Sequence, residues 1–225
     1  MSELTVFSAR ACPFAHRTRL VLGEKRLEFE LVEIDLQNKP SWFNAVSVYG
    51  KVPALQHAGQ RIVESAIINE YLDEVFPEPK LLPAAPAARA TARIWVDFAN
   101  TRFVTAWGRL LRGETAQERD AARLALEEAL EHLESAGLAR LSGEGPFFLG
   151  SEISLVDLAL YPWFERWAAL EHYRGYAVPL RFERLQRWQQ AVRARPAVRE
   201  IENPIGFYIE RYARYAQPAL QAAAS

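Results

Sequence analysis

Four prolines lie within residues 77–86, and no other feature constrains the fold of this chain as strongly. Proline fixes its own φ, has no backbone N–H and disfavours a helix at the residue before it, so this segment separates two folded units. Short apolar runs with turn signals precede the segment, and helical periodicity alone follows it. We therefore predict two domains, a mixed α/β domain over residues 1–79 and an all-helical domain over residues 87–225.

Apolar periodicity in the first domain predicts the order β-α-β, an irregular stretch and then β-β-α. Ala58-Gly59, between the last two expected strands, is a hairpin signal. The expected strands are residues 4–7, 29–34, 54–57 and 61–63, and the expected helices are residues 13–24 and 65–76. In the second domain, helices are expected over residues 87–112, 116–140, 154–170, 180–194 and 204–216.

The charges of the chain are balanced, with 27 basic and 28 acidic residues and a net charge of −1. No excess charge attracts nucleic acid or an anionic membrane surface, so we expect neither as a partner. A single cysteine excludes a disulfide framework and suits a reducing compartment. The first residues show no signal-peptide pattern, and no apolar run approaches the ~18 residues that cross a bilayer. We expect a cytoplasmic protein.

The single cysteine, Cys12, follows the first expected strand and begins the first expected helix. A helix N-terminus stabilises a thiolate, and Arg17 and Arg19 either add positive charge or face solvent, so we expect a lowered pKa. Pro13 suits the first helical position. Ala15 stands where a dithiol motif would have its second sulfur, so an external thiol such as glutathione would have to resolve a disulfide at Cys12. The alternative is an inert, buried cysteine, which the local spacing alone favours.

Two further segments have the features of a binding site for a peptide-like ligand. A cis peptide bond before Pro53 would leave the backbone of Val52 free to pair with such a ligand, although an ordinary trans proline is the commoner local alternative. Ser65 is expected to cap a helix whose free N–H groups attract a carboxylate, and Glu64 suits an ammonium. The alternative for this pair is a plain N-cap beside a solvated acid.

The remaining motifs indicate a role in folding or in lining a pocket. Ser154 and Asp157 form a capping arrangement that we assign to folding. The four histidines have no metal-ligand spacing, so we expect no metal site. The segment from Phe207 to Tyr212, which includes Tyr208 and Arg211, combines aromatic and basic character, and with a balanced net charge it favours a helix that lines an apolar pocket.

Taken together, these motifs resemble the cysteine-type glutathione transferases of the omega and lambda classes. The resemblance covers nearly the whole chain. Its segments are Cys12-Pro13-Phe14-Ala15 with Arg17, residues 34–43, 51–55 and 64–67, and the helical-domain signature over residues 147–166. It implies a thioredoxin-like N-terminal domain, an all-α C-terminal domain and an active site in the cleft between them. The subclass and the choice between monomer and homodimer stay open.

The resemblance implies a glutathione-dependent thiol transferase or reductase with glutathione as co-substrate and Cys12 as the nucleophile. Its second substrate would be a mixed disulfide or a small electrophile such as dehydroascorbate or a glutathionyl-ketone. The implied glutathione-binding residues are Phe14, Leu36, Lys39, Val52, Pro53, Glu64 and Ser65. The implied second-substrate pocket contains Phe207, Tyr208 and Arg211.

Two other functions remain as alternatives. One is a conventional conjugating transferase, which activates the glutathione thiol with a hydroxyl, and Ser8 is the nearest hydroxyl in the sequence. The other is a non-enzymatic adaptor with the same fold. The joint presence of Cys12, Lys39 and Glu64-Ser65 argues against an adaptor.

Overall fold

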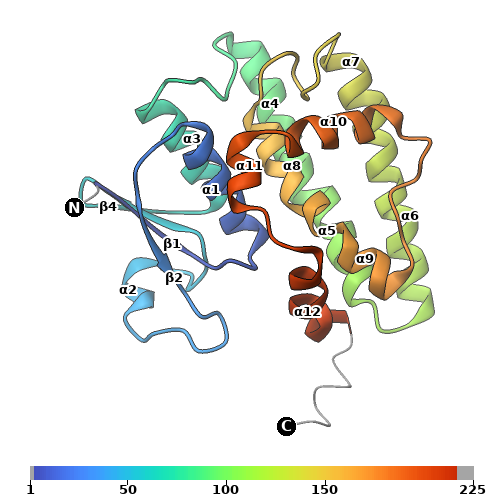
Figure 1. Cartoon of the computed structure of the whole chain (residues 1–225), viewed down its shortest axis with the longest axis horizontal. Helices are drawn as coiled ribbons and strands as arrows, with labels where there is room; N and C mark the ends of the chain where they lie inside the picture. The colour runs from blue at the N-terminus through green and yellow to red at the C-terminus, as the bar shows by residue number, and fades with distance from the viewer. Residues whose placement is uncertain (1–2, 217–225) are drawn as a thin grey trace.

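The computed structural model describes residues 3–216, and its N-terminal part is built on a four-stranded mixed sheet (Figure 1). The strands are β1 (Leu4–Ser8), β2 (Glu30–Glu33), β3 (Ala54–His57) and β4 (Gln60–Val63), in the order β2-β1-β3-β4. β1 is parallel to β2, and the other neighbours are antiparallel. The parallel pair needs a crossover connection, which helix α1 (Pro13–Glu24) supplies.

Buried apolar side chains hold the helices on the sheet. Leu20 of α1 and Ile68 of α3 (Ser65–Val75) are fully buried in the same core as Val6 of β1. A smaller core contains Phe7 and Phe43, whose ring centroids are 6.2 Å apart, and it holds the short helix α2 (Phe43–Val46). These two cores place the start of α1 between the sheet and the rest of the molecule (Figure 1).

The C-terminal part is helical. Its elements are α4 (Pro86–Phe98), the π-helical segment η1 (Ala99–Phe103), α5 (Val104–Arg112), α6 (Ala116–His132), the π-helical segment η2 (Leu133–Leu138), α7 (Ala139–Leu141), α8 (Leu155–Glu165), α9 (Trp167–Arg174), α10 (Glu183–Arg193), α11 (Pro196–Ile201) and α12 (Ile205–Ala216). Among residues 64–216 there is no strand, only an isolated bridge between Phe147 and Gly150. The predicted fold class, an α/β unit followed by an all-α unit, is confirmed.

Three of the expected helices differ in the structure. The expected helices over residues 87–112 and 116–140 each contain a π-helical segment, η1 and η2. In place of the one expected over residues 154–170 there are α8 and α9, which meet at Arg166 with φ −91° and ψ 4°. The Arg166 guanidinium donates to the Pro162 carbonyl oxygen at 2.7 Å, which is the acceptor that the Arg166 backbone N–H would use in a continuous helix. The short helices α2 and α11 were not predicted, because four and six residues carry little periodicity.

Side chains of α1 join the two parts of the molecule. The buried Arg17 side chain donates to the Ala159 carbonyl oxygen at 2.8 Å and to Oδ1 of Asn100 at 2.6 Å. At the other end of α1, Glu24 pairs with Arg195 at 2.5 Å. These contacts hold α1 against the helical part, and Figure 1 shows α1 next to α8 and α11.

The proline-rich segment is held by a buried ion pair. Nζ of Lys25 lies 2.7 Å from Oδ1 of Asp73 and donates to the carbonyl oxygens of Phe76 and Pro79. The division into residues 1–79 and 87–225 stays a prediction, and the structure ends α3 at Val75 and begins α4 at Pro86. None of the helices within residues 3–216 combines the length and the apolar character that crossing a bilayer requires.

Candidate functional site

Cys12 is the N-cap residue of α1 and has an extended backbone, with φ −77° and ψ 120°. Pro13 occupies the first helical turn, as expected. The Cys12 N–H donates to the Ala9 carbonyl oxygen at 2.9 Å, which closes the turn after β1. The half-buried side chain places Sγ 3.8 Å from the carbonyl oxygen of Val52. The strand-turn-helix arrangement therefore brings the sulfur to the segment that precedes β3.

Two cavities meet at the ring of Phe14, which lines both of them. We call the first the sheet-side cavity. It has a volume of about 130 Å³ and is lined by Phe14, Ser47, Val52, Pro53, Glu64 and Ser65, among others. We call the second the interdomain cavity. It has a volume of about 210 Å³ and is lined by Cys12, Phe14, Leu36, Trp107, Trp163 and Tyr212, together with residues described below.

The structure brings five of the seven expected glutathione-binding residues to the sheet-side cavity: Phe14, Val52, Pro53, Glu64 and Ser65. The peptide bond between Val52 and Pro53 is cis. The other two lie elsewhere. Leu36 lines the interdomain cavity, and Lys39 is exposed and is not among the lining residues of either cavity.

Only one of the three expected second-substrate residues lines the interdomain cavity, although the Arg211 guanidinium lies 5.7 Å from the Phe207 ring centroid. Arg211 lines the interdomain cavity, as expected. Tyr208 is fully buried, and its hydroxyl donates to the Glu165 carboxylate and accepts from Nδ2 of Asn203 at 3.0 Å. Phe207 packs against the guanidinium of Arg10, which lies 4.7 Å from the ring centroid. Neither Phe207 nor Tyr208 is among the lining residues of the interdomain cavity.

The start of α3 differs from the expected cap. Glu64 is the N-cap residue and Ser65 is the first helical residue, so the expectation that Ser65 caps this helix is wrong. Glu64 has φ 69° and ψ 115°, a conformation that side chains disfavour because Cβ crowds the backbone. A residue held in such a conformation costs about 1–3 kcal/mol, and such residues concentrate at binding sites.

The environment of Cys12 corrects the expected pKa. Burial raises the pKa of the Cys12 thiol, while the N–H groups of Ala15 and Phe14 and the charges of Arg166 and Arg19 lower it by less. The expectation of a lowered pKa is therefore wrong. Burial removes water that would stabilise the thiolate, and the helix N-terminus and the arginines stabilise the thiolate by less than this loss.

Arg17 and Arg19 are both buried rather than exposed. The Arg17 guanidinium lies 4.4 Å from the ring centroid of Trp163 and 5.1 Å from that of Phe14, so it supports the aromatic wall between the cavities. Burial lowers the pKa of Arg17 to about 9, which leaves it positively charged at neutral pH. Nη2 of Arg17 is buried without a hydrogen-bond partner among the described residues.

Sequence reasoning missed Arg166, which is completely buried. Its Nη1 lies 3.0 Å from Nδ1 of His16, and its guanidinium lies 4.5 Å from the Tyr208 ring centroid. Its Nε and Nη2 have no hydrogen-bond partner among the described residues. The nearby acidic side chain is Glu165, whose carboxylate feels the charge of Arg166 and lies 3.7 Å from Nε2 of His16. The sequence signal was the segment that ends in Glu165-Arg166, but nothing in it indicated that α8 would end there and turn this guanidinium toward Cys12.

Tyr212 lies one helical turn after Tyr208, in the segment expected to line a pocket, but it was not among the three expected second-substrate residues. Its side chain is buried, lines the interdomain cavity and places the hydroxyl 3.4 Å from the Ala11 carbonyl oxygen. Burial raises the pKa of Tyr212 to about 12, so the hydroxyl remains a hydrogen-bond donor at neutral pH. The spacing of four residues was visible in the sequence, but the face of α12 that meets the cavity was not.

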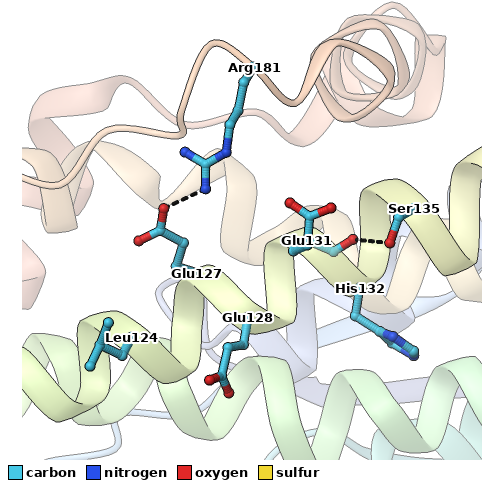
Figure 2. Close-up of a pocket in the computed structure, with 7 residues that line it drawn as sticks. All are labelled: Leu124, Glu127, Glu128, Glu131, His132, Ser135 and Arg181. Atoms are coloured by element: carbon cyan, nitrogen blue, oxygen red, sulfur yellow. Dashed lines mark hydrogen bonds and ion pairs between the residues drawn. The ribbon is translucent and has the colours of Figure 1, made fainter.

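A third hollow, of about 410 Å³, lies over α6 and away from Cys12 (Figure 2). Figure 2 shows the Glu127 carboxylate paired with Arg181, while His132 points toward the opposite side of α6. The His132 ring packs against Trp95, with centroids 5.0 Å apart. This hollow lies away from the single cysteine, so we assign the chemistry to the two cavities beside Cys12. Within residues 3–216, acidic, histidine and cysteine side chains form no group of three that could hold a metal ion.

The chain matches two protein-family models, "Glutathione S-transferase, N-terminal domain" over residues 6–80 and "Glutathione S-transferase, C-terminal domain" over residues 116–191. It is 35% identical over 172 residues to glutathione S-transferase omega-1 of Rattus norvegicus, a match that covers 75% of this chain and 69% of the relative.

Solved structures agree with these matches. Glutathione transferase Omega 3C from Trametes versicolor has a TM-score of 0.85 and 29% identity, over 98% of this chain and 93% of the other. A dehydroascorbate reductase from Chlamydomonas reinhardtii has a TM-score of 0.80 and 27% identity, over 94% of this chain and 98% of the reductase chain. The thioredoxin-like sheet and the helical part agree with these relatives, and the chain belongs to the glutathione S-transferase family as an omega-like glutathione transferase enzyme.

Proposed function

We propose that this enzyme is a glutathione-dependent thioltransferase that acts through Cys12. The Cys12 thiolate attacks the glutathionyl sulfur of a mixed disulfide RS–SG, which forms Cys12–S–SG and releases RS⁻. The thiolate of a second glutathione then attacks the glutathionyl sulfur of this mixed disulfide. That step yields oxidised glutathione and restores the Cys12 thiolate. The net reaction is RS–SG + GSH → RSH + GSSG, so one glutathione molecule is consumed and the glutathionyl group of the substrate forms the other half of the oxidised glutathione.

The position of Cys12 carries this proposal. Its sulfur borders the interdomain cavity and lies 3.8 Å from the Val52 carbonyl oxygen, which belongs to the sheet-side cavity. A group bonded to this sulfur has room on both sides. Cys12 is the only cysteine in the chain, so the second thiol of the reaction must come from a substrate.

Glutathione fits the sheet-side cavity by its chemistry. We propose that the free N–H groups at the start of α3, with Ser65, hold the γ-glutamyl carboxylate and that Glu64 holds the ammonium. The Val52 backbone before Pro53 pairs with the cysteinyl amide, and Phe14 covers the ligand. Lys39 is exposed on a flexible side chain, so we propose only a weak contact to the glycyl carboxylate.

Several substrates share this first step. Mixed disulfides, dehydroascorbate and glutathionyl-ketones all require a nucleophilic thiol and glutathione, and the likeness to a dehydroascorbate reductase supports reduction over conjugation. We also propose a cytoplasmic location, because glutathione chemistry and an unpaired cysteine suit a reducing compartment.

Intact-mass measurement tests the proposal. After incubation with oxidised glutathione, the wild-type protein should gain one glutathionyl group, which added glutathione removes. The Cys12→Ser variant should gain none and should lose thiol transfer while it still binds glutathione in calorimetry.

A conjugating transferase would give the opposite result. Such an enzyme keeps its transfer rate without Cys12 and uses a hydroxyl. Ser8 is a poor candidate for that hydroxyl, because its side chain is completely buried and is not among the residues lining either cavity. Undiminished turnover in Cys12→Ser would overturn the thioltransferase proposal.

A further inference from the structure

The interdomain cavity is positively charged. Three arginines line it: Arg112 at the end of α5, and Arg211 and Arg214 on α12. No aspartate or glutamate is among its lining residues in the described part of the chain. A cavity with cations and no acidic side chains attracts an anion, because each guanidinium gains a partner that the protein does not supply.

These arginines are not occupied by protein carboxylates. Among residues 3–216, none of the three takes part in a salt bridge. Nη2 of Arg214 donates to the Tyr215 hydroxyl at 2.7 Å, and its Nε is buried without a described acceptor. The guanidiniums of Arg112 and Arg214 lie 5.4 Å and 4.7 Å from the Tyr215 ring centroid. Tyr215 therefore holds both guanidiniums near the cavity and leaves their charges unneutralised.

A second, independent observation also points to an acceptor on the ligand. Trp107 lines the cavity and is only 3% exposed, and its indole N–H has no acceptor among the described residues. Buried N–H donors are nearly always paired, because an unpaired one costs about 1–3 kcal/mol. The cavity thus combines a buried free donor with three cations.

The walls of the cavity are aromatic. Trp107 meets Tyr212 edge to face with ring centroids 5.6 Å apart, and Trp163 meets Phe14 in the same way at 5.0 Å. Aromatic walls favour a flat apolar body on the ligand. The volume of about 210 Å³ equals that of about seven water molecules, which suits one aromatic ring with a small substituent.

Gly108 contributes to the position of Arg112. A Cβ on Gly108 would lie 2.7 Å from Nη1 of Arg112, so an alanine there has to displace the guanidinium. The absence of a side chain at Gly108 therefore lets Arg112 lie across α5.

We propose that the interdomain cavity selects second substrates whose leaving thiol has an aromatic body and an anionic group such as a carboxylate. This inference rests on the proposed thioltransferase function and names its substrate class. The glutathionyl half of the disulfide lies in the sheet-side cavity, and the aromatic half lies in the interdomain cavity. When the Cys12 thiolate attacks the glutathionyl sulfur, the disulfide bond breaks and the aromatic thiolate leaves beside the three arginines.

Three matched mixed disulfides of glutathione test the selection. Their aromatic thiols are 4-mercaptobenzoate, 4-mercaptobenzamide and 4-(aminomethyl)thiophenol, which have similar shapes and carry a negative, a neutral and a positive group. We expect kcat/KM of the wild-type enzyme to be about tenfold higher for the benzoate than for the benzamide, and lowest for the amine. Salt should reduce the preference for the benzoate.

Variants identify the groups responsible. Arg112→Gln, Arg211→Gln and Arg214→Gln should each lower kcat/KM for the benzoate about three- to tenfold and leave the benzamide nearly unchanged. Arg109→Gln, on the same helix but not among the residues lining the interdomain cavity, is the matched control and should change nothing. Thermal melts show whether each variant is folded, which matters most for the partly buried Arg214.

The outcomes separate this inference from the proposed function. If the benzamide reacts as fast as the benzoate, or if the arginine variants slow all three substrates equally, the proposed selection is wrong. If none of the disulfides reacts, the thioltransferase proposal fails. Calorimetry with two unreactive thioethers, S-(4-carboxybenzyl)glutathione and S-(4-carbamoylbenzyl)glutathione, then decides the anion preference on its own, since equal affinities would overturn it.

Discussion

At the scale of single residues, Cys12 shows how a helix N-terminus and burial act on one thiol in opposite directions. Burial raises its pKa, while nearby N–H groups and the charges of Arg166 and Arg19 lower it. The raised pKa means that the free enzyme holds most of its Cys12 as thiol at neutral pH. Folding therefore binds this proton more tightly than the unfolded chain does, and the stability it contributes is lost as the pH rises through the alkaline pKa.

The first prediction concerns the pH dependence of Cys12. Because the thiolate is the reactive form, alkylation by iodoacetamide should accelerate with pH and reach its plateau above the usual cysteine value of about 8.5. Arg166→Gln should move this profile further toward alkaline pH, and Arg166→Lys should restore it in part. Quenching the alkylation at set times and measuring the modified fraction by mass spectrometry gives the rate at each pH. A rate that reaches its plateau at or below neutral pH would contradict the environment described for Cys12.

The second prediction concerns the strained backbone of Glu64. Glycine adopts positive φ without the Cβ conflict, so Glu64→Gly should leave the protein as stable as the wild type or more stable by up to about 1 kcal/mol. The same change removes the proposed ligand of the glutathione ammonium and should weaken glutathione binding about ten- to a hundredfold. Denaturant unfolding and calorimetry measure the two effects. Glu64→Ala, which retains Cβ, is the control that weakens binding without the gain in stability.

At the scale of elements, two helices begin with the same capping box in different surroundings. Asp157 at the start of α8 is fully buried, and its carboxylate accepts from the Phe148 N–H at 2.8 Å and the Trp188 indole N–H at 2.7 Å, besides Ser154. At the start of α6 the N-cap residue is Thr115, and the exposed Glu118 carboxylate accepts a hydrogen bond from the Thr115 N–H. The α8 box therefore joins separate segments, while the α6 box serves its own helix.

The third prediction compares these two boxes. Asp157→Ala leaves several buried donors without an acceptor and should lower the free energy of unfolding by about 3–5 kcal/mol. Glu118→Ala should cost only about 0.5–2 kcal/mol, because water replaces the lost acceptor. Urea unfolding of both variants checks the difference. Equal losses would show that the buried contacts of Asp157 add nothing to the cap.

At the scale of the whole molecule, α1 connects the sheet to the helical part through its buried Arg17 and through the pair of Glu24 with Arg195. The same helix presents Cys12 to the interdomain cavity and places its sulfur 3.8 Å from the carbonyl oxygen of Val52, which lines the sheet-side cavity. The site therefore exists only while the two parts are docked, and their contacts are as important for function as the residues around the sulfur.

The fourth prediction follows from this docking. The two parts should unfold in one cooperative transition, because separation would expose the buried Arg17 without its partners. Tryptophan fluorescence reports mainly on the helical part, which holds five of the six tryptophans, and thiol titration of Cys12 reports on the other part. The two curves should coincide in urea. Exposure of Cys12 at a lower urea concentration than the fluorescence change would show that the parts unfold separately.

The sequence by itself determined the order of elements, the α/β and all-α division and the placement of Cys12 at the start of α1, because periodicity, prolines and turn residues act locally. Strand and helix starts also indicated four of the residues that gather at the sheet-side cavity, namely Val52, Pro53, Glu64 and Ser65, and the family resemblance added Phe14. Only the tertiary structure decided the direction of the Cys12 pKa shift, the roles of Arg166 and Tyr212 and the charge of the interdomain cavity. Burial and the juxtaposition of α5, α8 and α12 with α1 arise from packing between segments that lie far apart in the chain, and no local pattern encodes them.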